Sequence, residues 1–87
     1  MPFQSGTADK ISGKLDAGTL PREVKSRMFA GYGTGLPCDA CETPIADTQV
    51  EWEFDGPDGQ TYRFHLGCAG LWEAERRRRG WLKPPTR

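Results

Sequence analysis

The chain has 87 residues, and its 12 basic and 12 acidic side chains give a formal net charge of zero at neutral pH. A domain of this size buries only about 60% of the surface that its unfolded chain exposes, so its hydrophobic core alone is marginal. The balanced charge argues against a uniformly cationic nucleic-acid-binding protein, and the sequence has no apolar run long enough for a transmembrane helix.

The charges are nevertheless unevenly distributed. Residues 38–60 hold seven acidic side chains and no basic one, whereas residues 61–87 hold seven basic side chains against two acidic ones. The N-terminus lacks the charged and apolar regions of a signal peptide. Reduced cysteines in a metal site would suit a reducing compartment, so we expect a cytoplasmic protein with no membrane association.

A short helix is predicted near the N-terminus. Thr7 is placed to cap it, and Asp9 falls in its first turn, where the helix dipole favours an anion. Ile11 and Leu15 are four residues apart and form a thin apolar stripe. Such a helix frays unless the stripe docks on another part of the chain. Gly18 is placed to end the helix.

The segment that follows is ambiguous. Leu20, Val24 and Met28 have helical spacing, but residues 22–30 also alternate as a strand does, and we favour an extended segment. Glycine then occupies every second position of residues 31–35. A phosphate-binding loop would need a following Lys-Ser/Thr and a helix, which are missing. We interpret this stretch as a lead-in whose backbone can approach the next segment closely.

Four candidate metal ligands follow in two pairs. A Cys-x2-Cys pair is separated by 23 residues from a His-x2-Cys pair, and together they use every cysteine and the single histidine of the chain. Thiolate sulfur and imidazole nitrogen are the ligands that Zn²⁺ prefers in closed, tetrahedral structural sites. We therefore predict one structural Zn²⁺ with no open position for a substrate. Its ligands would be Cys38, Cys41, His65 and Cys68.

Other interpretations of these residues explain less. A disulfide between Cys38 and Cys41 would leave Cys68 unpaired and give His65 no role. A redox Cys-x2-Cys motif lacks its usual βαβ surroundings, and the common iron–sulfur spacings differ from this one. Three buried, unliganded cysteines with a solvated histidine are the simplest alternative.

A β-hairpin is predicted between the two pairs. Residues 48–55 alternate between apolar and acidic side chains, residues 55–60 form a turn, and residues 61–65 form the return strand. We expect the hairpin glutamates to be solvated and Arg63 to pair with one of them. The apolar inner face would hold Val50, Trp52, Phe54, Tyr62 and Phe64.

A second helix is predicted from about His65 to Arg79, with Gly80 as its C-terminal stop. Leu71 and Trp72 should pack under the hairpin. The chain thus divides into an N-terminal helix and glycine-rich lead-in (residues 1–36), a zinc-binding module (residues 37–80) and a flexible tail (residues 81–87).

A zinc knuckle, a hairpin and two further ligands at the start of a helix form the layout of treble-clef zinc fingers, and residues 38–72 resemble that family. The ligand frame is similar to the first zinc module of LIM domains. It is also similar to the fingers of poly(ADP-ribose) polymerases, where an Ile follows the knuckle and a Trp follows the last ligand, as Ile45 and Trp72 do here. The glycine-rich lead-in and the Trp-x-x-Glu-Arg ending resemble small bacterial zinc proteins of unassigned function.

The resemblance implies a small α+β zinc-stabilised domain with a knuckle, an antiparallel hairpin and a C-terminal helix, preceded here by the short N-terminal helix. It supports the four ligands and little else, because treble clefs serve DNA binding, protein binding and scaffolding alike. A LIM domain continues into a second zinc module, for which this chain has no ligands left. Polymerase fingers bind DNA breaks, whereas the hairpin of this chain is acidic.

Two functions fit these expectations, and neither is enzymatic, because the sequence offers no nucleophile–base pair and its only histidine is a predicted ligand. The first is a small adaptor or regulatory module that binds another protein. Exposed aromatic and apolar residues would form the interface, with Trp81, Leu82, Phe29 and Tyr32 as candidates. The second is binding of DNA or RNA through phosphate contacts of the basic C-terminal helix. Its candidates are Arg76, Arg77, Arg78, Arg79 and Lys83.

Overall fold

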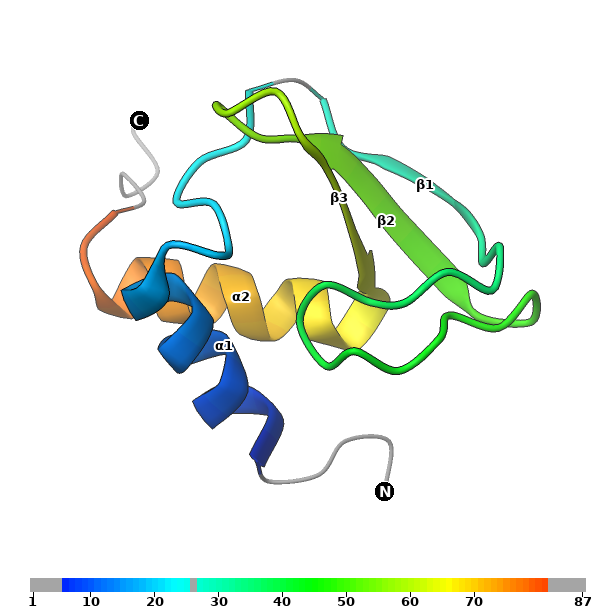
Figure 1. The fold of residues 1–87 in the computed structure, drawn as a ribbon, viewed down its shortest axis with the longest axis horizontal. Coiled ribbons are helices and arrows are strands. Elements are labelled where there is room, and N and C mark those ends of the chain that lie inside the picture. The colour runs from blue at the N-terminus through cyan, green and yellow to red at the C-terminus, as the bar shows by residue number, and fades with distance from the viewer. Residues whose placement is uncertain (1–5, 26, 82–87) are drawn as a thin grey trace, which may run out of the picture.

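The computed structural model describes residues 6–25 and 27–81 of the chain. These residues form two helices and a small sheet, which make an α+β domain, and Figure 1 shows how the elements are arranged. The elements follow in the order α1 (Gly6–Ala17), β1 (Phe29–Tyr32), β2 (Val50–Asp55), β3 (Thr61–His65) and α2 (Leu66–Arg78). Neither helix has the length and apolar character that crossing a membrane would require, as far as the described residues go.

The sheet is antiparallel and has the strand order β1-β2-β3. The predicted hairpin is confirmed, since β2 pairs with β3 and Trp52 lies opposite Phe64. The sequence predicted only these two strands, but β1 adds a third on the other side of β2, with Ala30 opposite Trp52. The extended segment expected over residues 22–30 is thus a strand only from Phe29 onward. With four residues, one of them glycine, β1 is too short to show the alternation of a strand in the sequence. Only its pairing with β2 makes it a strand.

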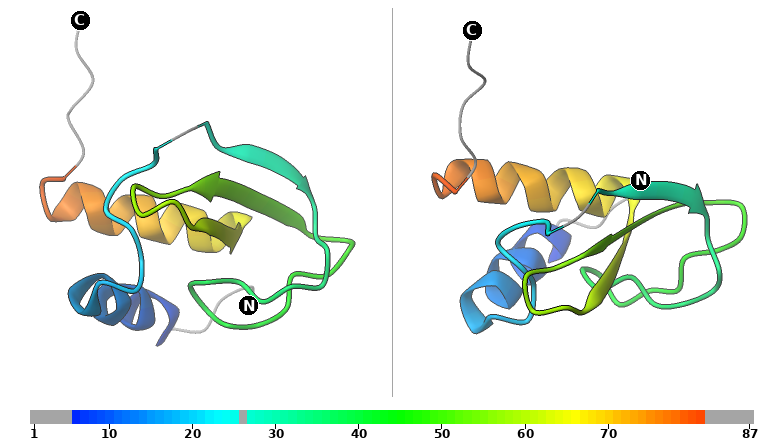
Figure 2. Two further views of the ribbon diagram at one scale, coloured as in Figure 1. Left: turned by 45° about the horizontal axis from the view of Figure 1, so that its top comes forward. Right: turned by 90° about the horizontal axis from the view of Figure 1, so that it is seen from above.

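The second helix, α2, packs on the β2–β3 pair, and the two views in Figure 2 show it running beside the sheet. The Trp72 ring stacks on Phe54 at 5.0 Å between ring centroids and lies 5.2 Å from Phe64. Its indole nitrogen donates a hydrogen bond to the Pro21 carbonyl at 3.0 Å. Gly80, at a φ of 80°, lies directly after the helix and provides the predicted stop.

The first helix, α1, docks on α2. The predicted stripe of Ile11 and Leu15 is buried, at 0% and 3% exposure, in the same core as Trp72. Gly18 has a φ of 80° and ends the helix, as predicted. Thr7 was expected to cap α1, but the helix begins at Gly6 and the Thr7 side chain is buried, so its role is packing and not capping.

Candidate metal centre

The first ligand pair lies on a tight turn, the knuckle of residues 38–41. The Cys38 amide donates to the Thr43 carbonyl at 3.0 Å, and the Glu42 amide donates to the Cys38 carbonyl at 2.8 Å. Glu42 has a φ of 71°, the left-handed conformation that lets the chain turn back on itself. These bonds hold Cys38 and Cys41 on one side of the turn.

The knuckle is joined to the outer edge of β3 by two hydrogen bonds of Asp39. Its amide donates to the Arg63 carbonyl at 2.8 Å, and its carboxylate accepts the Arg63 amide at 2.7 Å. Burial raises the pKa of Asp39, although the bond from the Arg63 amide opposes that rise. His65 is two residues further along β3, so this pairing brings the second ligand pair to the first. The sequence does not indicate this role of Asp39, because its contact depends on a strand residue 24 positions away.

The four donor atoms of the predicted ligands lie within 4.8 Å of one another. The His65 Nδ1 is 3.4 Å from the Cys41 Sγ and 3.9 Å from the Cys68 Sγ. Zinc–ligand bonds of about 2.0–2.3 Å in a tetrahedron place neighbouring donor atoms roughly 3.5–3.8 Å apart. The cluster is therefore suited to hold one metal ion. Its members are Cys38, Cys41, His65 and Cys68.

Hydrogen bonding favours negative charge on the Cys38 sulfur of this cluster, whereas burial opposes negative charge on both buried sulfurs. Cys38 and Cys68 are buried at 1% and 0% exposure, and all three cysteines are free thiols and not disulfides. The hydrogen bond from Cys68 lowers the pKa of Cys38, and the same contact together with burial raises the pKa of Cys68. The His65 amide also points to the Cys38 Sγ at 3.5 Å. Thiolates this close repel one another, so a bound cation would stabilise the fully deprotonated set.

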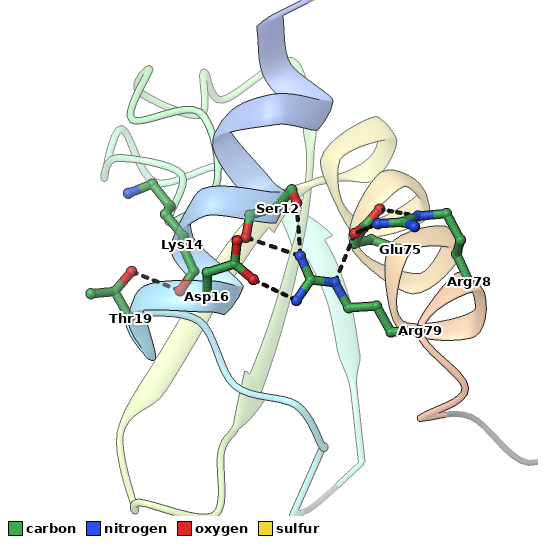
Figure 3. Close-up of polar contacts among 7 residues, drawn as sticks. All are labelled: Ser12, Lys14, Asp16, Thr19, Glu75, Arg78 and Arg79. Atoms are coloured by element: carbon green, nitrogen blue, oxygen red, sulfur yellow. Dashed lines mark hydrogen bonds and ion pairs between the residues drawn. The ribbon is translucent and has the colours of Figure 1, made fainter.

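The arginines of α2 point in different directions. Arg76 is 7% exposed, lies 4.1 Å over the Trp72 ring, and donates from Nε to the Arg22 carbonyl at 2.7 Å. Arg79 reaches across to α1, as Figure 3 shows. Its guanidinium donates to the Asp16 carboxylate and the Ser12 hydroxyl, each at 2.7 Å. Both side chains are therefore engaged inside the protein.

The other two arginines face solvent. The side chains of Arg77 and Arg78 are 67% and 68% exposed. Arg77 lies 3.8 Å from Glu73, and Arg78 pairs with Glu75, as Arg79 also does. Hydrogen bonds from Arg78 and Arg79 lower the pKa of Glu75 to about 2. Nucleic-acid binding stays a prediction, and fewer arginine side chains face solvent than the sequence suggests. Lys83 lies outside the described residues.

The candidate interface residues also differ in how exposed they are. Phe29 and Tyr32 lie on β1 and are 62% and 78% exposed. Trp81 is half-buried, with the Arg22 guanidinium 4.5 Å from its ring centroid and that of Arg79 at 5.2 Å. Leu82 lies outside the described residues. The exposed aromatic surface of the described chain is therefore on β1.

The expectation that the hairpin glutamates are solvated is wrong for Glu51. The sequence predicted solvated hairpin glutamates, but Glu51 is 5% exposed. Its carboxylate accepts hydrogen bonds from the Thr34 amide and hydroxyl at 3.3 and 3.2 Å, and the predicted pairing with Arg63 is present at 3.4 Å. The lead-in of residues 33–36 covers this side of β2, which the alternation of the hairpin could not show.

Gly33 explains how the lead-in reaches this position. A Cβ atom there would lie 2.1 Å from the Ala46 carbonyl oxygen and 2.5 Å from that of Ile45. The interpretation of the glycine-rich stretch as a close backbone approach is thus supported at this position. Ile45 itself is fully buried in the core that contains Cys38 and Cys68.

Comparison with family models, with curated proteins and with solved structures finds no match to this chain.

Proposed function

We propose that the chain is a treble-clef-like zinc finger that binds one structural Zn²⁺. The observation that carries this proposal is the Cys3His cluster, whose four donor atoms lie within 4.8 Å of one another. Three thiolates and one imidazole are a donor set typical of Zn²⁺, whereas Mg²⁺ and Ca²⁺ prefer oxygen ligands. The ligands would be Cys38, Cys41, His65 and Cys68.

The proposed role of the metal is structural and not catalytic. A catalytic zinc keeps one coordination position for water or substrate, and four protein donors leave none. Cys38 and Cys68 are also part of the hydrophobic core. A metal bound there would link the knuckle to α2 and stabilise the fold directly.

Metal content tests this proposal. We expect the purified protein to contain one Zn²⁺ per chain, and Co²⁺ substituted for it to show the absorption of a tetrahedral, thiolate-rich site. Cys68→Ser should abolish tight binding, whereas the control Thr43→Ser, beside the knuckle but not a ligand, should leave it unchanged. A protein that folds fully without metal, or a Cys68→Ser variant of unchanged zinc affinity, would overturn the proposal.

We further propose that the zinc-stabilised fold acts as a protein-interaction module in the cytoplasm. The support is the exposed aromatic surface of Phe29 and Tyr32 on β1, because exposed aromatic residues often anchor interfaces. A photo-crosslinking residue at position 32 should capture a discrete partner, whereas the same group at the exposed turn residue Gln60 should not. Equal yields at both positions would contradict an interface on β1.

Nucleic-acid binding is the second candidate, favoured only by the exposure of Arg77 and Arg78. It predicts weak binding of labelled DNA or RNA that falls steeply with salt and disappears in the double variant Arg77→Ala/Arg78→Ala. Unchanged fluorescence anisotropy at low salt would exclude this candidate.

A further inference from the structure

The two edges of the sheet differ in a way that points to a partner. At the β3 edge, the outward amide and carbonyl of Arg63 are both bonded to Asp39 of the knuckle. The β1 edge has no such cover among the described residues: all four residues of β1 are exposed. Natural proteins protect free edges with charges, prolines or bulges, but the β1 sequence Phe-Ala-Gly-Tyr has no charge and no proline.

The register shows which backbone groups are free. The Gly33 amide donates to the Gln49 carbonyl, so alternate residues of β1, Gly31 and Phe29, direct their backbone groups toward β2. The amides and carbonyls of Ala30 and Tyr32 therefore point away from the sheet. They are available to pair with another extended strand.

A groove lies between α2 and β2, and Met28, the residue just before β1, is part of its lining. Its volume is about 230 Å³, and its lining includes Met28, Trp52, Leu66, Ala69, Gly70 and Glu73. The Trp52 indole nitrogen is buried and has no hydrogen-bond partner among residues 6–25 and 27–81, which is costly. Ala30 lies opposite Trp52 in the register and is the small residue between the groove and the open edge.

We infer that β1 pairs antiparallel with β1 of a second copy of this chain, forming a two-fold symmetric, six-stranded sheet. This inference deepens the interaction role proposed above, on which it rests, by naming the partner. The two-fold axis passes at Gly31, so Tyr32 of each copy lies opposite Ala30 of the other, and all four sets of outward backbone groups are satisfied.

Side-chain sizes favour this register. Tyr32 lies on the same face of the sheet as Ala30 and Trp52, because residues two apart on a strand and paired residues share a face. The Tyr32 ring of the second copy can extend across the small Ala30 toward the groove and cover the part of the Trp52 side chain that is still exposed there. Phe29, on the other face, lies beside the glycines of the second copy, an arrangement that stabilises glycine at strand edges.

Electrostatics does not oppose the contact. The chain has a formal net charge of zero, so two copies experience no overall repulsion, and proteins near zero net charge associate more readily. An edge-to-edge contact of four residues is small, so we expect a reversible dimer and not an obligate one.

The test is sedimentation equilibrium of the full, zinc-loaded chain over a concentration series. Wild type should pass from 9.7 kDa to twice that mass as its concentration rises. Tyr32→Lys and Ala30→Glu should each raise the dimer dissociation constant at least about tenfold, because each places an unpaired charge at the interface. An equimolar mixture of the two should recover the dimer, since the register places the new lysine opposite the new glutamate. Gln60→Lys, at the exposed turn between β2 and β3, is the matched charge control.

A second readout is the indole N–H signal of Trp52 in NMR spectra, identified with Trp52→Phe. It should shift on dilution of wild type and not on dilution of Tyr32→Lys. The inference is overturned if wild type stays monomeric throughout, if both variants dimerise as wild type does, or if mixing gives no recovery. Zinc content measured in the same samples separates these outcomes from loss of the metal site, which would contradict the proposed function instead.

Discussion

Arg79 shows how one side chain can join two elements that are far apart in the sequence. It lies just after α2, and its guanidinium bonds to Glu75 of α2 and to Asp16 and Ser12 of α1. Its side chain is only 18% exposed, so these charged hydrogen bonds are partly shielded from water. Arg77, two residues earlier, faces solvent, and its only ion pair among the described residues is with Glu73 at 3.8 Å. Neighbouring residues of identical type therefore contribute differently to stability.

We predict that Arg79→Lys lowers the free energy of unfolding by about 1–2 kcal/mol, because a lysine cannot keep the forked set of bonds to three groups. The matched variant Arg77→Lys should change it by less than about 0.5 kcal/mol. Urea unfolding in the presence of zinc measures both, and hydrogen exchange should report faster opening of α1 in Arg79→Lys only. Equal effects of the two substitutions would contradict the assigned link between the helices.

At the scale of elements, the lead-in of residues 33–36 determines how the knuckle and the segment after it pack against the sheet. Gly33 passes close to the carbonyls of Ile45 and Ala46, and the Gly35 amide donates to the Ile45 carbonyl at 2.9 Å. Thr34 in turn satisfies the buried carboxylate of Glu51. Because the obstructing atoms at Gly33 belong to backbone, they cannot move aside as a flexible side chain would.

We predict that Gly33→Ala destabilises the fold by about 1–3 kcal/mol or more, because its Cβ atom would overlap the Ala46 carbonyl. Gly13→Ala is the control: Gly13 is an exposed residue of α1 with nothing within 4 Å of an added Cβ. Alanine should stabilise that helix position by about 0.5–1 kcal/mol. Thermal unfolding with zinc bound should therefore shift in opposite directions for the two variants. A Gly33→Ala variant as stable as wild type would contradict the close approach.

On the scale of the whole molecule, one core contains residues from both helices, from β2 and β3, and from the metal cluster. Ile11 and Leu15 of α1, Phe54 of β2 and Trp72 of α2 are buried in the same cluster as Cys38 and Cys68. Zinc binding in small finger domains contributes about 10–16 kcal/mol at neutral pH, which equals or exceeds the net stability of about 5–15 kcal/mol that is usual for a domain.

We therefore predict that chelation of the metal unfolds the domain cooperatively. The near-ultraviolet circular dichroism of the packed Trp72 and the far-ultraviolet signal of the sheet should be lost together, and added Zn²⁺ should restore both. The chelator already saturated with zinc is the control. Retention of the sheet signal and of the thermal midpoint after chelation would show that the core folds without metal.

The sequence by itself determined the features that depend on local spacing. The two ligand pairs, the β2–β3 hairpin, the buried stripe of α1 and the glycine stops after both helices could all be predicted, because each pattern is read within one element or one turn. The four candidate ligands could be grouped because structural zinc sites are built from Cys and His, and the chain has no other residue of these two types.

Only the tertiary structure decided which surfaces meet. It made β1 a third strand, buried Glu51 beneath the lead-in, bonded Arg76 to the Arg22 carbonyl and directed Arg79 to α1. None of these contacts joins residues within one periodic pattern, and a charged residue looks the same in sequence whether it is solvated or paired. Burial depends on the segments that fold over a residue, and those segments come from distant parts of the chain.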